Sequence, residues 1–297
     1  MSLSCRRLFH SLRPLQHENP LGLPKSGSIP RFQRGLPEKR KIKDVAKVVA
    51  VSSAKGGVGK STVAGELPLR RHSSPTSAQA DEQWQQTCLS PLRGKATDPK
   101  NHDCRQVYNQ LLPLSNYGVK TMSMGYLVGE DAPVVWRGLM VMKALQQLLH
   151  EVEWGGLDIL VLDLPPGTGD TQLSITQQIV LDGSVVVTTP HTLAVKDAIK
   201  GVNMFKKVNV PILGLVQNMS VFRCPHCHGE TAVFGSSEGV RKVCSEHHID
   251  FLGDIPLHPN IGEDAHLGKP TVVSEPGSDR AQAFMKIAEE IGVKIGM

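Results

Sequence analysis

The sequence lacks the features of membrane-spanning and of disulfide-stabilised proteins. No apolar run approaches the roughly 18 residues that a spanning helix needs, so we expect membrane association to be peripheral at most. The six cysteines among 297 residues are scattered, and only Cys224 and Cys227 lie close together, which argues against a disulfide framework. With 40% hydrophobic and 21% charged residues, the chain has the composition of a soluble globular protein with a sizeable core.

Acidic residues are missing from the start of the chain. No acid precedes Glu18, and the same stretch contains Arg6, Arg7 and Arg13 with several serines and leucines. This composition is typical of a mitochondrial transit peptide, with a disordered basic tail as the alternative. Much of the net charge of +5 comes from this region, so the basic balance indicates a targeting arm and not a nucleic-acid-binding surface. We predict a targeting segment and linker over residues 1–40, a domain over 41–297 and a location in the mitochondrial matrix.

A glycine-rich segment follows the first apolar run of that domain. Val48 to Val51 is short and β-branched, which predicts a buried strand, and a plausible helix start comes after the glycines. Backbone N–H groups of such a loop and of a helix N-terminus can surround a phosphate. The sequence therefore predicts a nucleotide-phosphate site, with Lys60 on the β- and γ-phosphates and Ser61 on Mg²⁺. Its residues are Gly56, Gly57, Val58, Gly59, Lys60, Ser61 and Thr62.

This motif departs from the usual phosphate loop (P-loop) in two positions. Ala54 stands where the first glycine of G-x-x-x-x-G-K-[ST] is expected, and Lys55 adds a second lysine inside the loop. KGGVGKST resembles the deviant P-loop of the SIMIBI ATPases. The resemblance implies that Lys55 reaches across a dimer interface to the nucleotide of the partner, so we count Lys55, Lys60 and Asp163 as candidate catalytic residues.

A second apolar strand ends in an acid. DILVLD, residues 158–163, is the Walker B pattern, and Asp163 is expected to hold Mg²⁺ because hard cations prefer carboxylate oxygens. The loop LPPGTGD follows directly at residues 164–170. Its prolines restrict the backbone, and Gly167 can bring its N–H to the γ-phosphate, which predicts a conformational switch.

The region between these two motifs contains no recognisable strand. Residues 67–106 carry neither a helical apolar stripe nor a strand-like run, so we predict a degenerate or disordered segment. Related P-loop proteins place a second strand here that ends in an acidic motif, D-x-D-x-x-G-P-S. Asp98 and Asp103 are the nearest acids, and neither matches that pattern. Because its aspartate helps to position the attacking water, ATP hydrolysis is left open.

Two further segments complete the predicted nucleotide site. Strands are expected over GSVVVTTP and PILGLVQNM, the second ending at Asn218, with a helix from about Ala194 to Lys207 between them. The resemblance implies that Asn218 reads the adenine edge and that the loop containing Pro256 closes over the base.

Cys224 and Cys227 form a C-x-x-C pair in a predicted metal loop over residues 222–230. Two thiolates at this spacing can share one metal centre, and sulfur favours zinc or iron–sulfur clusters. With Cys244 and His247 the spacing is also that of a zinc knuckle. Alternatively, two chains each supply one pair and hold a [4Fe–4S] cluster between them. Inert thiols are the third interpretation, and Cys244 is predicted on the buried side of a helix.

Together these features predict an α/β fold, a P-loop NTPase with a mostly parallel sheet flanked by helices and a small C-x-x-C insertion. KGGVGKST, DLPPGTGD, QNMS and C-P-x-C resemble the Mrp-type P-loop ATPases that carry iron–sulfur clusters. The resemblance implies a homodimer that binds ATP with Mg²⁺ and delivers a [4Fe–4S] cluster to apo-proteins, with a mitochondrial member serving complex I assembly. The alternatives are a nucleotide-binding scaffold with a zinc site and no effective hydrolysis, and a MinD- or ParA-like positioning ATPase.

Overall fold

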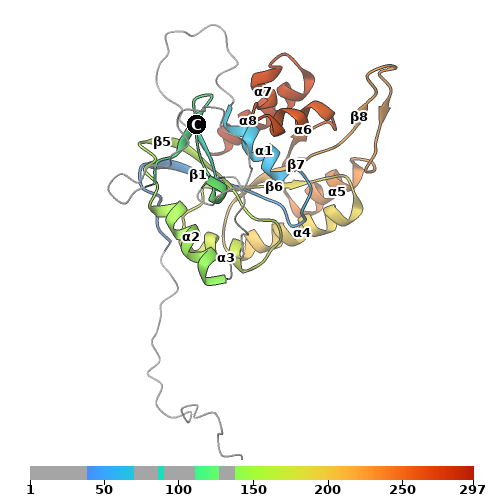
Figure 1. The fold of residues 1–297 in the computed structure, drawn as a ribbon. Coiled ribbons are helices and arrows are strands. Elements are labelled where there is room, and N and C mark those ends of the chain that lie inside the picture. The colour runs from blue at the N-terminus through green and yellow to red at the C-terminus, as the bar shows by residue number, and fades with distance from the viewer. Residues whose placement is uncertain (1–38, 70–85, 90–110, 127–137) are drawn as a thin grey trace, which may run out of the picture. The chain divides into compact units, whose positions relative to one another are not determined.

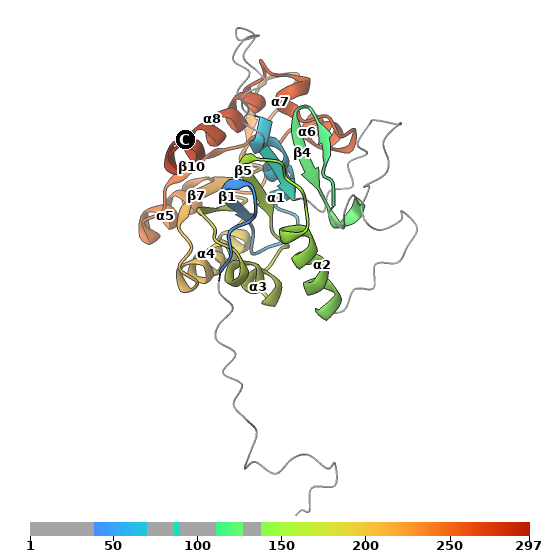
Figure 2. The ribbon, with the colours of Figure 1, turned by 90° about the vertical axis from the view of Figure 1, so that its left-hand side faces the viewer.

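The computed structural model describes residues 39–69, 86–89, 111–126 and 138–297. Most of the predicted targeting segment, residues 1–40, therefore lies outside the described residues. The strands form an eight-stranded sheet in the order β10-β7-β6-β1-β5-β2-β4-β3. Figure 2 shows β4 and β10 toward opposite ends of this sheet. Their bounds are β1 Val45–Ser52, β2 Gln86–Leu89, β3 Leu114–Asn116, β4 Val119–Met122, β5 Leu157–Asp163, β6 Gly183–Thr188, β7 Ile212–Gln217 and β10 Phe251–Asp254.

All neighbouring strands pair in parallel except β3 and β4, which are antiparallel. The central strand β1 alternates between two cores, with Val48 and Ala50 in one and Val49 and Val51 in the other. This alternation follows from the period of two along a strand and from burial of both faces. The predicted mostly parallel α/β sheet is confirmed.

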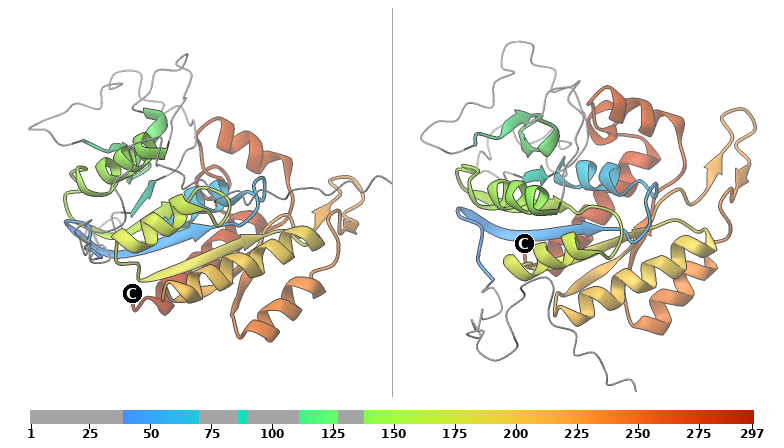
Figure 3. Two further views of the ribbon diagram at one scale, coloured as in Figure 1. Left: turned by 90° about the horizontal axis from the view of Figure 1, so that it is seen from below. Right: turned by 60° about the horizontal axis from the view of Figure 1, so that its bottom comes forward.

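Helices cover both faces of the sheet (Figures 1 and 3). The first core, which contains Val48 and Ala50 of β1, also contains buried residues of one set of helices. The second core, which contains Val49 and Val51, contains those of the P-loop helix and the C-terminal helices. The first set is α2 Gly138–His150, α3 Asp170–Gln178, α4 Thr192–Lys207 and α5 Glu238–His247, and the second is α1 Lys60–Glu66, α7 Thr271–Ser274 and α8 Asp279–Lys294. The remaining elements are α6 Pro259–His266, the 3₁₀ turns Leu67–Leu69 and Met124–Tyr126, and a hairpin of β8 Phe222–Arg223 with β9 Glu230–Thr231. No helix in the described ranges is long and apolar enough to cross a membrane.

The prediction that residues 67–106 contain no strand is wrong. Residues 86–89 form β2, which pairs in parallel with β5 on one side and with β4 on the other. The strand therefore occupies an interior position of the sheet. Because β4 and β5 supply hydrogen-bond partners on both sides, this segment forms a strand although its own sequence has no clear apolar pattern. Asp98 and Asp103 lie outside the described residues.

Candidate functional site

The predicted nucleotide motifs meet at one edge of the sheet. β1, β5, β6 and β7 run in parallel, and the P-loop, the LPPGTGD loop and Asn218 each follow the carboxyl end of one of these strands. Val51 pairs with Asp163, which brings the start of the P-loop beside the Walker B acid. In open parallel sheets this edge is where ligands bind.

The P-loop has the backbone conformation that its glycines permit. Gly57 and Gly59 adopt left-handed φ angles of 80° and 76°, which residues with a Cβ rarely adopt. Val58 between them is buried, whereas Gly56 and Gly57 are exposed. Gly59 is the N-cap of α1, which begins at Lys60. Exposed main chain at Gly56 and Gly57, separated by two residues from the start of a helix, is suited to bind phosphate.

Lys60 lies between the two oxygens that were predicted to bind Mg²⁺. Its ammonium forms a buried ion pair with Asp163 and donates a hydrogen bond of 3.3 Å to the Ser61 hydroxyl. A carboxylate and a hydroxyl that already surround one positive charge are a donor set that suits a hard cation. Ser61 and Asp163 therefore fit Mg²⁺. Lys55 and Thr62 are half-buried at the two ends of the loop.

The loop after β5 is joined to the segment that leads into the P-loop. The Gly167 N–H donates to the Ser53 carbonyl at 3.0 Å, and the Ser53 hydroxyl donates to the Lys55 carbonyl at 3.0 Å. The amide of Gln172, on α3, donates to the Pro165 carbonyl in the loop. For the Gly167 N–H to reach a γ-phosphate, its bond to Ser53 has to break, which is the kind of movement a switch loop makes.

The segment after β7 connects three parts of the site. The Asn218 amide donates to the carbonyl of Val58 in the P-loop. Two residues further on, the Ser220 N–H donates to the Ile255 carbonyl at 3.0 Å, and the Leu257 N–H donates to the Val221 carbonyl at 2.8 Å. The predicted adenine loop, with Pro256 half-buried between these contacts, is therefore bonded to the base of the β8–β9 hairpin.

This hairpin extends away from the body of the domain (Figure 1). Cys224 and Cys227 lie in the turn between β8 and β9. Cys227 is exposed and Cys224 is half-buried. The turn closes through hydrogen bonds from the Cys224 N–H to the Gly229 carbonyl and from the His228 N–H to the Cys224 carbonyl. Hydrogen bonds from the backbone N–H groups of Cys227 and His226, and from the Cys227 thiol, lower the pKa of Cys224. A lowered pKa favours the thiolate, which is the form that ligates metal.

The hairpin is also held from the side by Arg223. Its guanidinium pairs with Glu230 on the opposite strand at 2.7 Å and with Asp279, the first residue of α8, at 3.1 Å. Sequence reasoning did not identify this contact, because the basic residue before C-x-x-C gives no sign of an acid 56 residues later. The contact links the hairpin to the start of α8.

A single-chain zinc knuckle is not formed. Cys244 is buried on α5, as predicted, and its burial raises the pKa of its thiol. Cys224, Cys227, Cys244 and His247 all lie in the described part of the chain, where no group of three or more metal-ligating side chains gathers. Cys224 and Cys227 thus stand as a two-ligand pair, half of the set that zinc or a [4Fe–4S] cluster requires.

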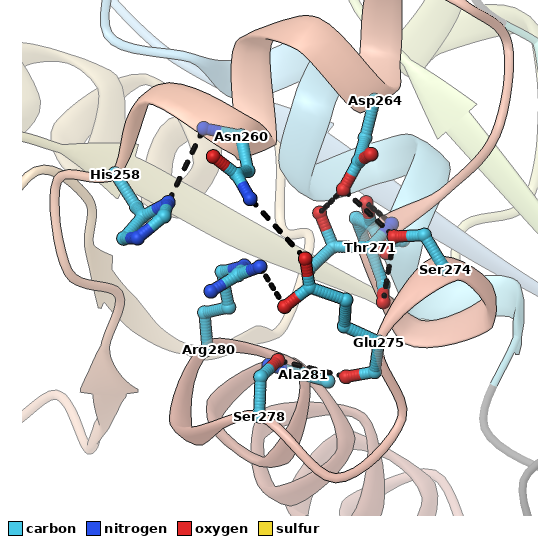
Figure 4. A network of polar contacts seen from close by, with 10 residues as sticks. His258, Asn260, Asp264, Thr271, Ser274, Glu275, Ser278, Arg280 and Ala281 are labelled. Atoms are coloured by element: carbon cyan, nitrogen blue, oxygen red, sulfur yellow. Dashed lines mark hydrogen bonds and ion pairs between the residues drawn. The ribbon is translucent and has the colours of Figure 1, made fainter.

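A polar network next to the predicted adenine loop was also missed from the sequence (Figure 4). His258 caps α6 by accepting from the Asn260 N–H, and Asn260 donates to Glu275 at 3.2 Å. Glu275 also pairs with the buried Arg280 of α8. Burial, followed by the charge of Arg280, lowers the pKa of His258. The network ties the loop after β10 to α8.

Comparison with known proteins agrees with this geometry. A family model of the ParA group, described as the NUBPL iron-transfer P-loop NTPase, matches residues 44–292. The chain belongs to this family. It is 49% identical over 260 residues to the iron–sulfur cluster transfer protein NUBPL of Mus musculus, covering 88% of this chain and 81% of the mouse protein. It is 44% identical over 254 residues to an Arabidopsis thaliana iron–sulfur protein required for NADH dehydrogenase, covering 84% and 79%.

Solved structures show the same fold. The nucleotide-binding protein of Archaeoglobus fulgidus in complex with ADP has a TM-score of 0.60 and 28% identity, covering 81% of this chain and 93% of that one. The septum site-determining protein MinD of Pyrococcus horikoshii, complexed with Mg-ADP, has a TM-score of 0.58 and 20% identity, covering 85% and 100%. At that identity the MinD likeness concerns the fold alone.

Proposed function

We propose that the protein is an ATP-binding carrier that assembles or transfers a [4Fe–4S] cluster. One observation carries this proposal: an accessible pair of cysteines stands on a hairpin whose base is hydrogen-bonded to the nucleotide site. The Leu257 N–H donates to the Val221 carbonyl at 2.8 Å, only three residues before Cys224. The cluster is cargo, so its ligands have to be reachable by a recipient protein, and Cys227 is exposed. Membership of an iron-transfer family supports the same conclusion.

The ligand count favours a homodimer. A [4Fe–4S] cluster takes four thiolates, and each chain offers Cys224 and Cys227. Two copies that place these hairpins together complete the set. In the same dimer the Lys55 ammonium reaches the nucleotide of the partner subunit.

Within each subunit, the nucleotide is bound by the motifs at the carboxyl edge of the sheet. Main-chain N–H groups from Gly56 to Thr62 and the Lys60 ammonium bind the phosphates, Ser61 and Asp163 hold Mg²⁺, and Gly167 senses the γ-phosphate. Asn218 and Pro256 contact the adenine. Bound Mg²⁺ supplies positive charge to the β- and γ-phosphates.

The clients are apo iron–sulfur proteins, and the subunits of respiratory complex I are the first to test. The relative in Arabidopsis thaliana is named as mitochondrial and as required for NADH dehydrogenase. We place the protein in the mitochondrial matrix, in line with the acid-free, Arg-rich start of the sequence.

Anaerobic reconstitution with ferrous iron and sulfide tests the proposal. Wild type is expected to bind about two irons per chain, that is, four per dimer, and to pass them to an apo [4Fe–4S] protein. Cys224→Ala and Cys227→Ala should each lose most of the iron, whereas Cys244→Ala, in the buried helix α5, should retain it. Equal iron in wild type and in both hairpin variants would contradict the cluster assignment.

A further inference from the structure

Asn218 uses its side chain to hold the P-loop. Its Nδ2 donates to the Val58 carbonyl at 2.9 Å, across 160 positions of sequence, and its Oδ1 accepts the Met219 N–H at 2.9 Å. The residue is only 7% exposed. Both ends of the amide are therefore bonded to main chain, so the orientation of the side chain is fixed from two sides.

The contact explains why Gly59 has to be a glycine. Gly59 follows Val58 directly and has a left-handed φ of 76°. A Cβ at this position would clash with Asn218 Nδ2, so the two could not coexist without a shift of the amide. The turn into α1 and the approach of Asn218 thus exclude a side chain for separate reasons, one of conformation and one of contact.

We propose that Asn218 is a positioning residue that fixes the phosphate loop, in addition to its contact with adenine. An amide carries two N–H groups and an oxygen with two lone pairs, so the bonds to Val58 and Met219 leave capacity for a base edge. One side chain then connects the base subsite with the phosphate subsite. The inference rests on the proposed function for the identity of the ligand, but the bond to the P-loop is a property of the protein alone.

Hydrogen–deuterium exchange without added nucleotide tests the bond itself. In Asn218→Ala, and in Asn218→Asp, which keeps an acceptor and loses the donor, the amides of the peptide containing Gly56 to Lys60 should exchange about tenfold faster than in wild type. Asn203→Ala, on the exposed side of α4, is the matched control and should not differ from wild type. Unchanged exchange in both Asn218 variants, with unchanged thermal midpoints, would overturn the inference.

Ligand affinity separates positioning from base recognition. The affinity for Mg-tripolyphosphate, which has no base, should weaken by about tenfold in Asn218→Ala, and the affinity for Mg-ATP, which also loses the adenine contact, should weaken by more. A loss confined to Mg-ATP would mean that Asn218 only reads the adenine and would overturn the positioning role. If wild type bound neither ligand, the proposed function would fail, whereas the exchange experiment would still decide the bond between Asn218 and Val58.

Discussion

Lys60 and Asp163 form the most deeply buried ion pair of the site, with side chains 6% and 0% exposed. Removal of one partner from a buried pair is costly, because the other charge stays in a poorly solvated position. We expect Lys60→Ala to lower the free energy of unfolding by roughly 3–5 kcal/mol. Urea denaturation followed by circular dichroism measures this loss.

The control for this prediction is a similar pair near the surface. Lys47 pairs with Asp182 at 3.2 Å, with side chains 37% and 26% exposed. Because solvent screens such a pair, Lys47→Ala should cost at most about 1 kcal/mol. An equal decrease in the free energy of unfolding in the two variants would mean that burial of the Lys60–Asp163 pair adds nothing to the cost of removing its lysine.

At the same scale, motif residues were predictable from the sequence and long-range contacts were not. Gly57, Gly59 and Lys60 stand in a fixed order after a strand, and this order dictates the local geometry of a phosphate loop. The bond from Asn218 to Val58 depends on which strands become neighbours in the sheet, and no local pattern encodes that. The same holds for Arg223 and Asp279.

At the scale of elements, Glu66 joins the P-loop helix to α7. Its carboxylate accepts the N–H groups of Thr271 and Val272 at 2.7 and 3.1 Å, and burial raises the pKa of this group above its ordinary value of 4.5. The folded state therefore binds the proton more tightly than the unfolded state. Glu66 therefore contributes to the free energy of unfolding fully at pH values below the pKa that it has in the unfolded chain. This contribution is lost as the pH rises through the raised pKa of the folded state.

Glu66→Gln removes this titration. We expect the free energy of unfolding of the variant, relative to wild type, to rise as the pH increases from about 4.5, as measured by urea denaturation across that range. Glu246→Gln, at an exposed position of α5, should give a curve parallel to that of wild type. A parallel curve for Glu66→Gln would show that its ionisation does not differ between the folded and unfolded states.

The strands that contain a run of apolar residues were predictable from the sequence, and the strand without such a run was not. Each of the strands β1, β5, β6 and β7 contains a run of apolar residues, as expected for strands buried on both faces, and all four were identified. The strand β2, with the sequence QTCL, has no such run. It was missed because its place is defined by hydrogen bonds to β4 and β5, which belong to later parts of the chain.

At the scale of the whole molecule, the proposed homodimer requires a surface around the cysteine hairpin. Val233 and Phe234 lie two and three residues after the end of β9, and both are exposed, at 54% and 37%. Exposed apolar side chains a few residues after the cysteine pair are well placed to be covered by a second subunit. The surface that they form continues the hairpin, so a second copy would bury it while completing the cluster ligands.

We therefore expect Phe234→Asp to weaken the iron-loaded dimer by at least about tenfold, because a charge would be buried at the contact. Anaerobic size exclusion with light scattering and iron analysis measures both mass and loading. Val293→Asp is the matched control: Val293 is 69% exposed, and it lies near the far end of α8, about 20 Å of helix away from Asp279, which binds the hairpin through Arg223. This variant should dimerise like wild type. An iron-loaded monomer of wild type, or a Phe234→Asp variant with unchanged mass and iron content, would exclude this surface as the dimer contact.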